Sequence, residues 1–307
     1  MSAATWARTL LRSRRLVALA VVLVTTALVV PSPAVRQAPT SLVKVESADG
    51  VDHQPHVLWI LLLGSDARPG QPLLRSRADA VQLVGINTAT GAATAIGIPR
   101  DSYVDVPGHG QNKINISMVY GGPQLMARSV ADMVGIRPDY VFTTGFVGFI
   151  ALVKDIGGVT VDSKFAFSDP VMPGGYQVGE NRVTGHQALI FSRIRKSLPR
   201  GDFDRSANQQ RTLLGILNKV RTHADRPGFM ERAVLSVLEN LDTDLSPAEL
   251  YRLAQAATTI SPGKFRACVV DGGIGYVGAA SVVFPDIAQA RSIANRARAD
   301  ATLEGPC

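Results

Sequence analysis

Runs of apolar residues mark several β-strands in the middle of the chain. The continuous run VLWILLL at residues 57–63 predicts a strand that is buried on both faces. Residues 80–86 and 92–98 also have strand character, and the polar segment 87–91 between them predicts a β-hairpin. Two further strands are predicted, at residues 140–143 and 159–167.

Periodic apolar positions predict helices around these strands, at residues 123–134, 146–156, 229–241 and 247–259. The tail from residue 261 shows no regular pattern. Strands and helices in this order predict an α/β (α+β) fold with a central mixed, largely buried β-sheet that is flanked by helices on both faces. A single N-terminal transmembrane helix and a helical C-terminal extension complete the predicted fold.

The N-terminus has the pattern of an exported protein. Residues 1–15 are basic and contain no acidic group, and an apolar run follows that reaches bilayer length if it continues to Val35. The run fits either a signal anchor or a cleaved signal, and the sequence PSPA favours the anchor because it is a poor cleavage site. The predicted parts are a cytoplasmic tail (1–15), a transmembrane anchor (16–35), a linker (36–56), a catalytic domain (57–222) and an extension (223–307).

Composition adds few constraints. Of the 307 residues, 46% are hydrophobic, which supports a sizeable core. The formal charge is +7, but four of these charges are arginines in the first 15 residues, so the basic pI gives little support to nucleic acid as a partner. Cys268 and Cys307 belong to no metal-binding motif, and a disulfide between them is an open alternative to free thiols in an oxidising compartment.

Residues 189–220 combine several arginines with the start of a helix. Residues 188–194 fit a short strand or a helix edge, and if they are extended, Arg193 and Arg195 point to one face. Asp202 and Asp204 suit the N-cap of a helix that begins near Asp204. Arginines that are partly buried need a countercharge, and several together suit a multiply charged anion such as a phosphate. The alternative is a solvated basic face with ordinary ion pairs.

Polar residues also cluster at the neighbouring ends of the predicted hairpin. Arg77 and Asp79 precede its first strand, and Arg100 and Asp101 follow its second. The full set of candidate site residues is Arg77, Asp79, Arg100, Asp101, Lys113, Asn115, Arg193, Arg195, Asp202, Arg205 and Gln209.

Cations and carboxylates in this mixture predict metal-assisted phosphoryl transfer. Carboxylates hold a hard cation such as Mg²⁺ (or Mn²⁺), and arginines bind phosphate oxygens and stabilise the transition state. Asp79, Asp101 and Asp202 are the candidate metal ligands.

Six segments resemble, in order, the successive motifs of the LytR-CpsA-Psr family. They are RADAVQLVGI, GIPRDSYVDVPGHGQNKIN, YGG, DIGGV, ALIFSRIR and GDFDRSANQQR, spread over residues 57–222. The resemblance implies an extracytoplasmic α/β domain that binds a polyprenyl-pyrophosphate-linked glycan and transfers the glycopolymer onto peptidoglycan.

The resemblance also assigns residues to roles. It implies that the pyrophosphate and its Mg²⁺ are bound by Asp79, Arg100, Arg193, Arg195, Asp202 and Arg205, and Gln209 matches a further site position. The sequence departs from the family pattern at Ala78, where Ser is usual, and at Asn208, where the usual Arg is replaced and one positive charge is lost.

We therefore expect a single-pass protein of the cell membrane, with a cytoplasmic N-terminus and an extracytoplasmic phosphotransferase domain. A sugar hydroxyl of peptidoglycan would attack the phosphorus nearest the glycan, and polyprenyl phosphate would leave. Two alternatives stay open: a polyprenyl-pyrophosphate pyrophosphatase, and a non-catalytic lipid-binding or regulatory envelope protein. The lipid tail needs an apolar channel, and residues suited either to that role or to ordinary core packing are Phe142, Phe146, Phe149, Ile150 and Val153.

Overall fold

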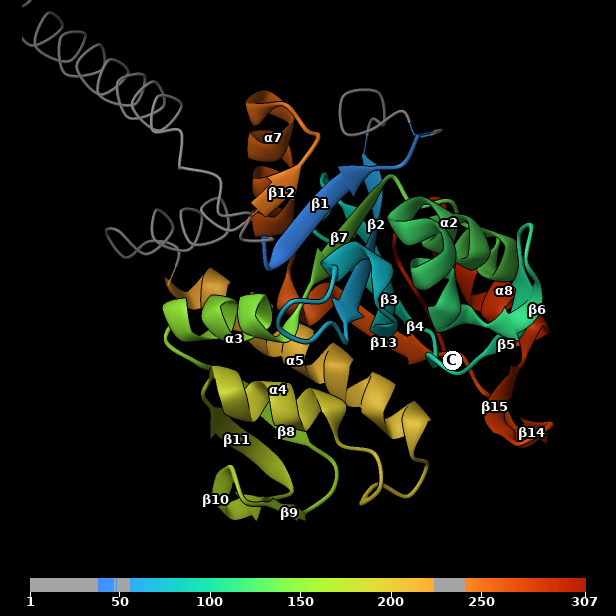
Figure 1. The fold of residues 1–307 in the computed structure, drawn as a ribbon. Coiled ribbons are helices and arrows are strands. Elements are labelled where there is room, and N and C mark those ends of the chain that lie inside the picture. Colours follow the sequence, from blue (N-terminus) through green and yellow to red (C-terminus); the bar gives the residue numbers. More distant parts are fainter. Residues whose placement is uncertain (1–37, 47, 49–55, 224–240) are drawn as a thin grey trace, which may run out of the picture. The chain divides into compact units, whose positions relative to one another are not determined.

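A mixed β-sheet of seven strands forms the centre of the fold. The structure is a computed structural model, and it describes residues 38–46, 48, 56–223 and 241–307. The strand order is β12-β1-β7-β2-β3-β4-β13 (Figure 1). In that order the strands are Leu241–Thr243, Thr40–Lys44, Tyr140–Thr144, Val57–Ser65, Ala78–Asn87, Ala93–Gly97 and Phe265–Val269.

The predicted hairpin is confirmed as β3 and β4. The two strands pair antiparallel with Leu83 opposite Ile96, and β3 pairs antiparallel with β2 on its other side. The backbone N–H of Ile98 still donates to the carbonyl of Val81 at 3.0 Å, so the pairing continues beyond β4. This register brings the start of β3 and the end of β4 to the same end of the sheet, where the predicted site residues cluster.

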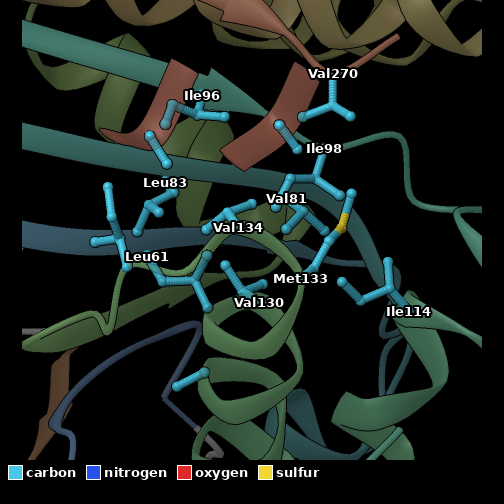
Figure 2. Close-up of a cluster of buried hydrophobic side chains, with 14 of the residues drawn as sticks. Leu61, Val81, Leu83, Ile96, Ile98, Ile114, Val130, Met133, Val134 and Val270 are labelled. Carbon is cyan, nitrogen blue, oxygen red and sulfur yellow. The ribbon is translucent and has the colours of Figure 1, made fainter. Parts of the chain in front are cut away.

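Helices α2 (Ser117–Val134) and α8 (Ile287–Ala297) cover one face of the sheet. Side chains alternate along a strand, so Leu61 and Leu83 point to this face and pack toward Val130 and Val134 of α2 (Figure 2). All four of these side chains are completely or almost completely buried. Helix α2 contains one non-helical residue, Gly122, immediately before the Pro123 at which the helix was predicted to begin.

Two other helices, α5 (Asp202–His223) and α7 (Pro247–Thr259), cover the opposite face. Ile60 and Leu62 point to this side, where Leu214 and Leu217 of α5 join the packing. The predicted mixed sheet with helices on both faces is therefore confirmed. Helix α5 approaches β4 very closely at Gly97, where an added Cβ would lie 2.5 Å from the Ser206 hydroxyl.

A smaller unit packs beside α5. It consists of helices α3 (Phe146–Asp155) and α4 (Gly185–Arg193) and two strand pairs, β8 (Val159–Ser163) with β11 (Gly179–Val183) and β9 (Phe167–Asp169) with β10 (Met172–Tyr176). Its core contains a cluster of three aromatic rings, Phe167, Tyr176 and Phe191, with centroids 4.5–6.0 Å apart. The hydroxyl of Tyr176 donates to the carbonyl of Gln187 in α4 at 2.7 Å. The cluster thereby holds α4, which ends at Arg193.

The remaining elements are the strand pair β5 (Tyr103–Val106) and β6 (Gly110–Lys113), the strand pair β14 (Gly272–Val277) and β15 (Ala280–Pro285), and the short helices η1 (Leu73–Arg75), η2 (Ile114–Ile116) and η3 (Pro262–Lys264). Of these, η3 lies at the far end of the sheet beside the turn at 87–91, and the others lie around the site end. A disulfide joins Cys268 in β13 to Cys307.

Two expectations about the elements were wrong, and one open choice is decided. The predicted linker 36–56 contains β1, which pairs with β7 and β12. Of the two alternatives for residues 188–194, a short strand or a helix edge, the helix is confirmed, because these residues belong largely to α4. The predicted helical extension 223–307 contains α7 and α8, but it also supplies both edge strands of the sheet, β12 and β13, and the β14–β15 pair. The strands β1, β12 and β13 are short and mix polar with apolar residues, so they show no clear hydrophobic pattern.

Some predicted segments lie outside the described residues. These are the basic tail, the anchor at 16–35, and the predicted helix 229–241 except for its last residue. Within the part of the chain that the structure describes, no helix has the length and apolar character needed to cross a bilayer.

Candidate functional site

A pocket of about 850 Å³ lies at the end of the β3–β4 hairpin. Its polar lining includes Arg77, Arg100, Asp101, Lys113, Asn115, Arg195 and Asp202. The strands β5 and β6 form one side of it through Tyr103 and Gln111, and the β14–β15 hairpin forms another. These seven predicted residues therefore meet at one cavity, although they come from the residue before β3, the loop after β4, β6, η2, the loop after α4, and α5.

Asp79 and Arg100 form the first ion pair of the site. Asp79 lies near the start of β3, and its carboxylate contacts the guanidinium of Arg100, which follows β4. The Nε of Arg100 is buried and has no hydrogen-bond acceptor among the described residues, although Asp101 Oδ2 lies 3.7 Å away. Burial tends to lower the pKa of Arg100, but the charges of Asp79 and Asp101 outweigh it and raise this pKa. Arg100 therefore stays fully charged.

Asp101 lies at the centre of the charged network. Its Oδ1 is 3.1 Å from Lys113 Nζ, and its Oδ2 is 3.7 Å from Arg195 Nη1. Lys113 ends β6 and precedes η2, where the buried Asn115 donates its backbone N–H to the carbonyl of Arg100 at 3.3 Å. The β5–β6 pair is thus joined to the β3–β4 hairpin at Asp101, the residue whose carboxylate contacts three cations.

Asp202 and Arg205 form the most deeply buried pair, with side chains that are 9% and 5% exposed. Arg205 Nη2 lies 2.5 Å from Asp202 Oδ1, yet neither carboxylate oxygen of Asp202 has a hydrogen-bond partner among the described residues, so the contact pairs charges without hydrogen-bond geometry. Burial raises the pKa of Asp202 and lowers the pKa of Arg205, and their mutual attraction offsets this only in part. The pair is therefore poorly solvated, and Asp202 borders the pocket.

The two arginines of the predicted RIR motif have different surroundings. Arg193 is the last residue of α4, and its guanidinium lies over the ring of Phe146 at 4.3 Å from the centroid. Arg195 instead lines the pocket and lies within 4.0 Å of both Asp101 and Asp202. An extended segment was the condition for both to point to one face, and it is not met, because Arg193 ends the helix and the backbone becomes extended only at Ile194.

The side chain of Gln209 links neighbouring elements through hydrogen bonds. Its amide nitrogen donates to the carbonyls of Asp79 (3.4 Å) and Ser192 (3.2 Å), and its Oε1 accepts from Gln82 Nε2 at 3.1 Å. Gln209 thus ties β3, α4 and α5 together beneath the ion pairs. Gln82 was not predicted, and only its polar character within an otherwise apolar strand could have indicated it.

Asn208, which replaces the family's arginine, faces away from this network. Its Nδ2 donates to the carbonyl of Phe191, and its Oδ1 accepts from Arg211 Nη1 at 2.6 Å. The lost positive charge would therefore have been placed at the interface of α4 and α5. The ion pairs around Asp101 and Asp202 do not involve this position.

The three carboxylates proposed as metal ligands do not form one cage. Among the described residues there is no cluster of three or more acidic, histidine or cysteine side chains suited to a metal ion. Asp101 and Asp202 nevertheless share Arg195 as a partner, and the oxygens of Asp202 accept no hydrogen bond from the described residues. Because Mg²⁺ commonly binds one or two carboxylates together with phosphate oxygens and water, these two residues fit such an ion. Asp79 faces Arg100 instead.

The apolar residues considered for a lipid channel divide into two groups. Val153 is fully buried, and Phe149 packs against the same cluster, so both contribute to the core of the smaller unit. Phe146 is half-buried beneath two arginines, Arg193 and Arg68, the latter 5.3 Å from the ring centroid. A channel for the lipid stays a prediction.

A second hollow of about 880 Å³ lies between β8 and α5. It contains cations such as Lys154 and Lys219 and acids such as Asp162, but none of the predicted site residues lines it. The chemistry described above belongs to the pocket at the end of the β3–β4 hairpin.

Comparison with known proteins gives consistent matches. The model of the LytR_cpsA_psr family matches residues 30–299. A polyisoprenyl-teichoic acid–peptidoglycan teichoic acid transferase, TagU from Bacillus licheniformis, is 36% identical over 180 residues, which are 57% of this chain and 56% of TagU. TagU from Enterococcus faecalis is 30% identical over 198 residues, 64% of each chain. The chain thus spans between half and two thirds of the length of these curated relatives.

Solved structures show the same fold. The structure titled "TagT bound to LI-WTA" is 26% identical, with a TM-score of 0.65 over 80% of this chain and 91% of that one. TagU from Bacillus subtilis is also 26% identical, with a TM-score of 0.60 over 82% of this chain and 99% of that one.

Proposed function

The chain belongs to the LytR_cpsA_psr family, and on this basis we propose that it is an extracytoplasmic phosphotransferase. It would move a glycopolymer from a polyprenyl-pyrophosphate carrier onto peptidoglycan, as the names of its relatives describe for teichoic acid. Residues 16–35 would anchor it in the cell membrane.

One observation carries the proposal: positive side chains outnumber carboxylates around one solvent-accessible pocket. Asp79, Asp101 and Asp202 face a larger set of cations, namely Arg77, Arg100, Lys113, Arg195 and Arg205. An excess of positive charge at the mouth of a pocket suits a multiply charged anion, and guanidinium groups bind phosphate oxygens in pairs. A pyrophosphate meets both conditions.

The residues present suit an in-line displacement at phosphorus. Arg195 and Lys113 would bind oxygens of the phosphoryl group that is transferred, because both are directed into the pocket and are only partly buried. Arg205 and Arg100, held by Asp202 and Asp79, would stabilise the negative charge of the transition state from fixed positions. Mg²⁺ held by Asp101 and Asp202 would neutralise the pyrophosphate further.

The test uses the full chain in detergent with a polyprenyl-pyrophosphate-linked sugar, Mg²⁺ and peptidoglycan fragments. We expect labelled sugar to become attached to the fragments, with polyprenyl phosphate released, and EDTA to abolish this reaction. Arg195→Ala should reduce transfer by about 100-fold or more, on the scale known for the loss of one preorganised contact to a transition state. Arg182→Ala, an exposed arginine of β11, serves as the matched control.

The same assay separates the alternatives. Release of free sugar phosphate with no attachment to the fragments would identify a pyrophosphatase. Tight lipid binding without turnover, retained in Asp79→Ala, would identify a binding protein.

A further inference from the structure

The β14–β15 hairpin forms an apolar wall of the charged pocket. Its residues Ile274 and Val277 and the segment 280–283 line the same cavity as Arg100 and Asp101. A two-residue turn joins the strands, and Gly278 in that turn has φ +59°, a conformation that tight hairpin turns require and glycine adopts readily. The GxGxxG pattern at 273–278 thus serves a hairpin, with no following helix of the dinucleotide-binding kind.

Contacts on both sides fix this hairpin to the charged loops. The backbone N–H of Val283 donates to the carbonyl of Asp101 at 2.9 Å, and the ring of Phe284 meets Tyr103 edge-on at 6.2 Å. At the base of the hairpin, Asp271 pairs with Arg200, which lies just before α5, at 2.7 Å. The hairpin is therefore held in register with Asp101 on one side and with the start of α5 on the other.

The outer part of the hairpin exposes large apolar side chains beside this pocket. Tyr276 is 73% exposed, Ile274 64% and Phe284 45%. Tyr276 and Ile274 alternate with Gly275 along β14, so they share one face. Exposed aromatic and aliphatic groups at the rim of a polar cavity suit a ligand with both kinds of surface. A sugar ring has this character, because its C–H faces are apolar and its hydroxyl groups are polar.

The two ends of the site indicate whether this sugar belongs to the donor or to the acceptor. Arg193 and Phe146 are not among the described residues that line the pocket, and they mark the end toward the apolar smaller unit, where a lipid chain would be accommodated. In an in-line displacement, the attacking hydroxyl lies opposite the leaving group. If polyprenyl phosphate leaves at the Arg193 end, the acceptor hydroxyl enters from the end that the β14–β15 hairpin walls.

We propose that the β14–β15 hairpin binds the glycan chain of the acceptor, with Tyr276 and Ile274 packing on the apolar faces of its sugar rings. The inference rests on the proposed transferase function and adds to it an acceptor-binding surface and the residues that form it. Because the hairpin is hydrogen-bonded to the Asp101 loop, a glycan seated on it is held in register with the reacting phosphorus.

The test measures transfer by the full chain in detergent while the concentrations of peptidoglycan fragments and of donor lipid are varied separately. In Tyr276→Ala, and in Ile274→Ser as a second variant, we expect the KM for the acceptor to rise about threefold to tenfold, the effect of losing one ring contact. Tyr251→Ala is the matched control, since Tyr251 lies on α7 and is 65% exposed; it should change neither constant.

Failure of this inference is distinguishable from failure of the function. If the wild-type chain transfers nothing, the transferase proposal itself fails. If it transfers normally and both hairpin variants keep the wild-type acceptor KM, the hairpin is not the acceptor surface. A rise confined to the donor KM, or a loss of binding to lipid vesicles with unchanged acceptor KM, would equally overturn the inference, in favour of the donor glycan or of the membrane.

Discussion

At the scale of single residues, the aspartates of the site would compete with the proposed pyrophosphate for the same cations. Arg100 contacts Asp79, Lys113 contacts Asp101, and Arg205 contacts Asp202. Substitution of one of these aspartates would free its cation to bind the ligand. It would also remove the fixed negative charge that holds this cation in place. Binding and turnover should respond differently to such a change.

Asp79→Asn is expected to lower kcat for transfer by about 100-fold without raising the KM for the donor lipid. The substitution keeps the shape of the side chain, but Arg100 loses its charged partner and the position that this partner defines. Steady-state kinetics with labelled donor measure both constants. Asp105→Asn is the control because Asp105 is exposed on β5 and has no ion pair among the described residues. A donor KM that rises in parallel with the loss of kcat would show that Asp79 contributes to binding instead.

Much of the residue-scale picture could be predicted. Arg77, Asp79, Arg100 and Asp101 flank the two strands of a hairpin, and hairpin ends are neighbours whatever the rest of the fold does. The divergence of Arg193 and the neighbouring Arg195 could not be predicted, because it depends on where α4 ends and on the ring of Phe146 in another helix.

At the scale of elements, helix α5 lies very close to β4. This close approach determines where the buried polar side chains of α5 lie relative to the site. Gly97 makes this approach possible, since a Cβ there would meet Ser206 Oγ at 2.5 Å and Gln210 Nε2 at 2.8 Å. Gln209, one turn along from Arg205, reaches the carbonyl of Asp79 from the same helix.

Gly97→Ala should move α5 away from the sheet. We expect the free energy of unfolding to fall by roughly 1 to 3 kcal/mol, as for other overpacked sites, and transfer activity to fall as well because Arg205 moves with the helix. Urea unfolding and the transfer assay measure the two effects. Gly263→Ala provides the comparison, because no described atom lies within 4 Å of the position of its Cβ and it should change neither quantity.

Tyr176 joins β10 to α4 and makes this contact dependent on pH. Burial, with the charge of Asp169, raises the pKa of Tyr176 to about 12. The folded protein therefore keeps its proton above pH 10, where the unfolded chain loses it, and this contribution to stability decreases as the pH rises from about 10 toward 12.

Tyr176→Phe removes the hydrogen bond to Gln187 and should destabilise the protein by about 1 kcal/mol at pH 8. The difference between wild type and variant should shrink as the pH rises from 8 to 10.5, because only the wild type has a phenol to titrate. Urea midpoints at each pH measure it, and a difference that grows with pH would contradict the assignment.

The strands that the sequence did not reveal share one property. β1 (TSLVK), β12 (LDT) and β13 (FRACV) are short and have polar residues within or beside their few apolar ones, so none shows the apolar run that marked β7 (YVFTT), which also has five residues. Their pairing is set by the strands beside them. β2 and β3, with nine and ten residues, were evident from the sequence because their own apolar pattern is long.

At the scale of the whole molecule, the C-terminal segment is part of the framework of the candidate site. Residues 241–307 supply both edge strands of the sheet and the β14–β15 wall of the pocket. The contact between Val283 and Asp101 spans 182 positions of the chain, so no local pattern could have predicted it.

The disulfide between Cys268 and Cys307 holds this segment in place. Reduction, or the Cys268→Ala, Cys307→Ala double variant, should lower the free energy of unfolding by roughly 3 to 4 kcal/mol for a bridge of this sequence separation, 39 residues. Thermal unfolding with and without dithiothreitol measures the effect. The double variant must be insensitive to dithiothreitol, and an equal response in both proteins would show that the reagent acts elsewhere.

The position of β13 has a consequence for biosynthesis. Its parallel partner β4 is made more than 160 residues earlier, and until residues 265–269 leave the ribosome, β4 presents an unpaired edge to other chains. At ordinary rates of synthesis this interval lasts on the order of 10 seconds. During that time the chain already carries its arginines and aspartates, but the sheet lacks its edge strand β13 and the pocket lacks its β14–β15 wall until residues 265–285 are made.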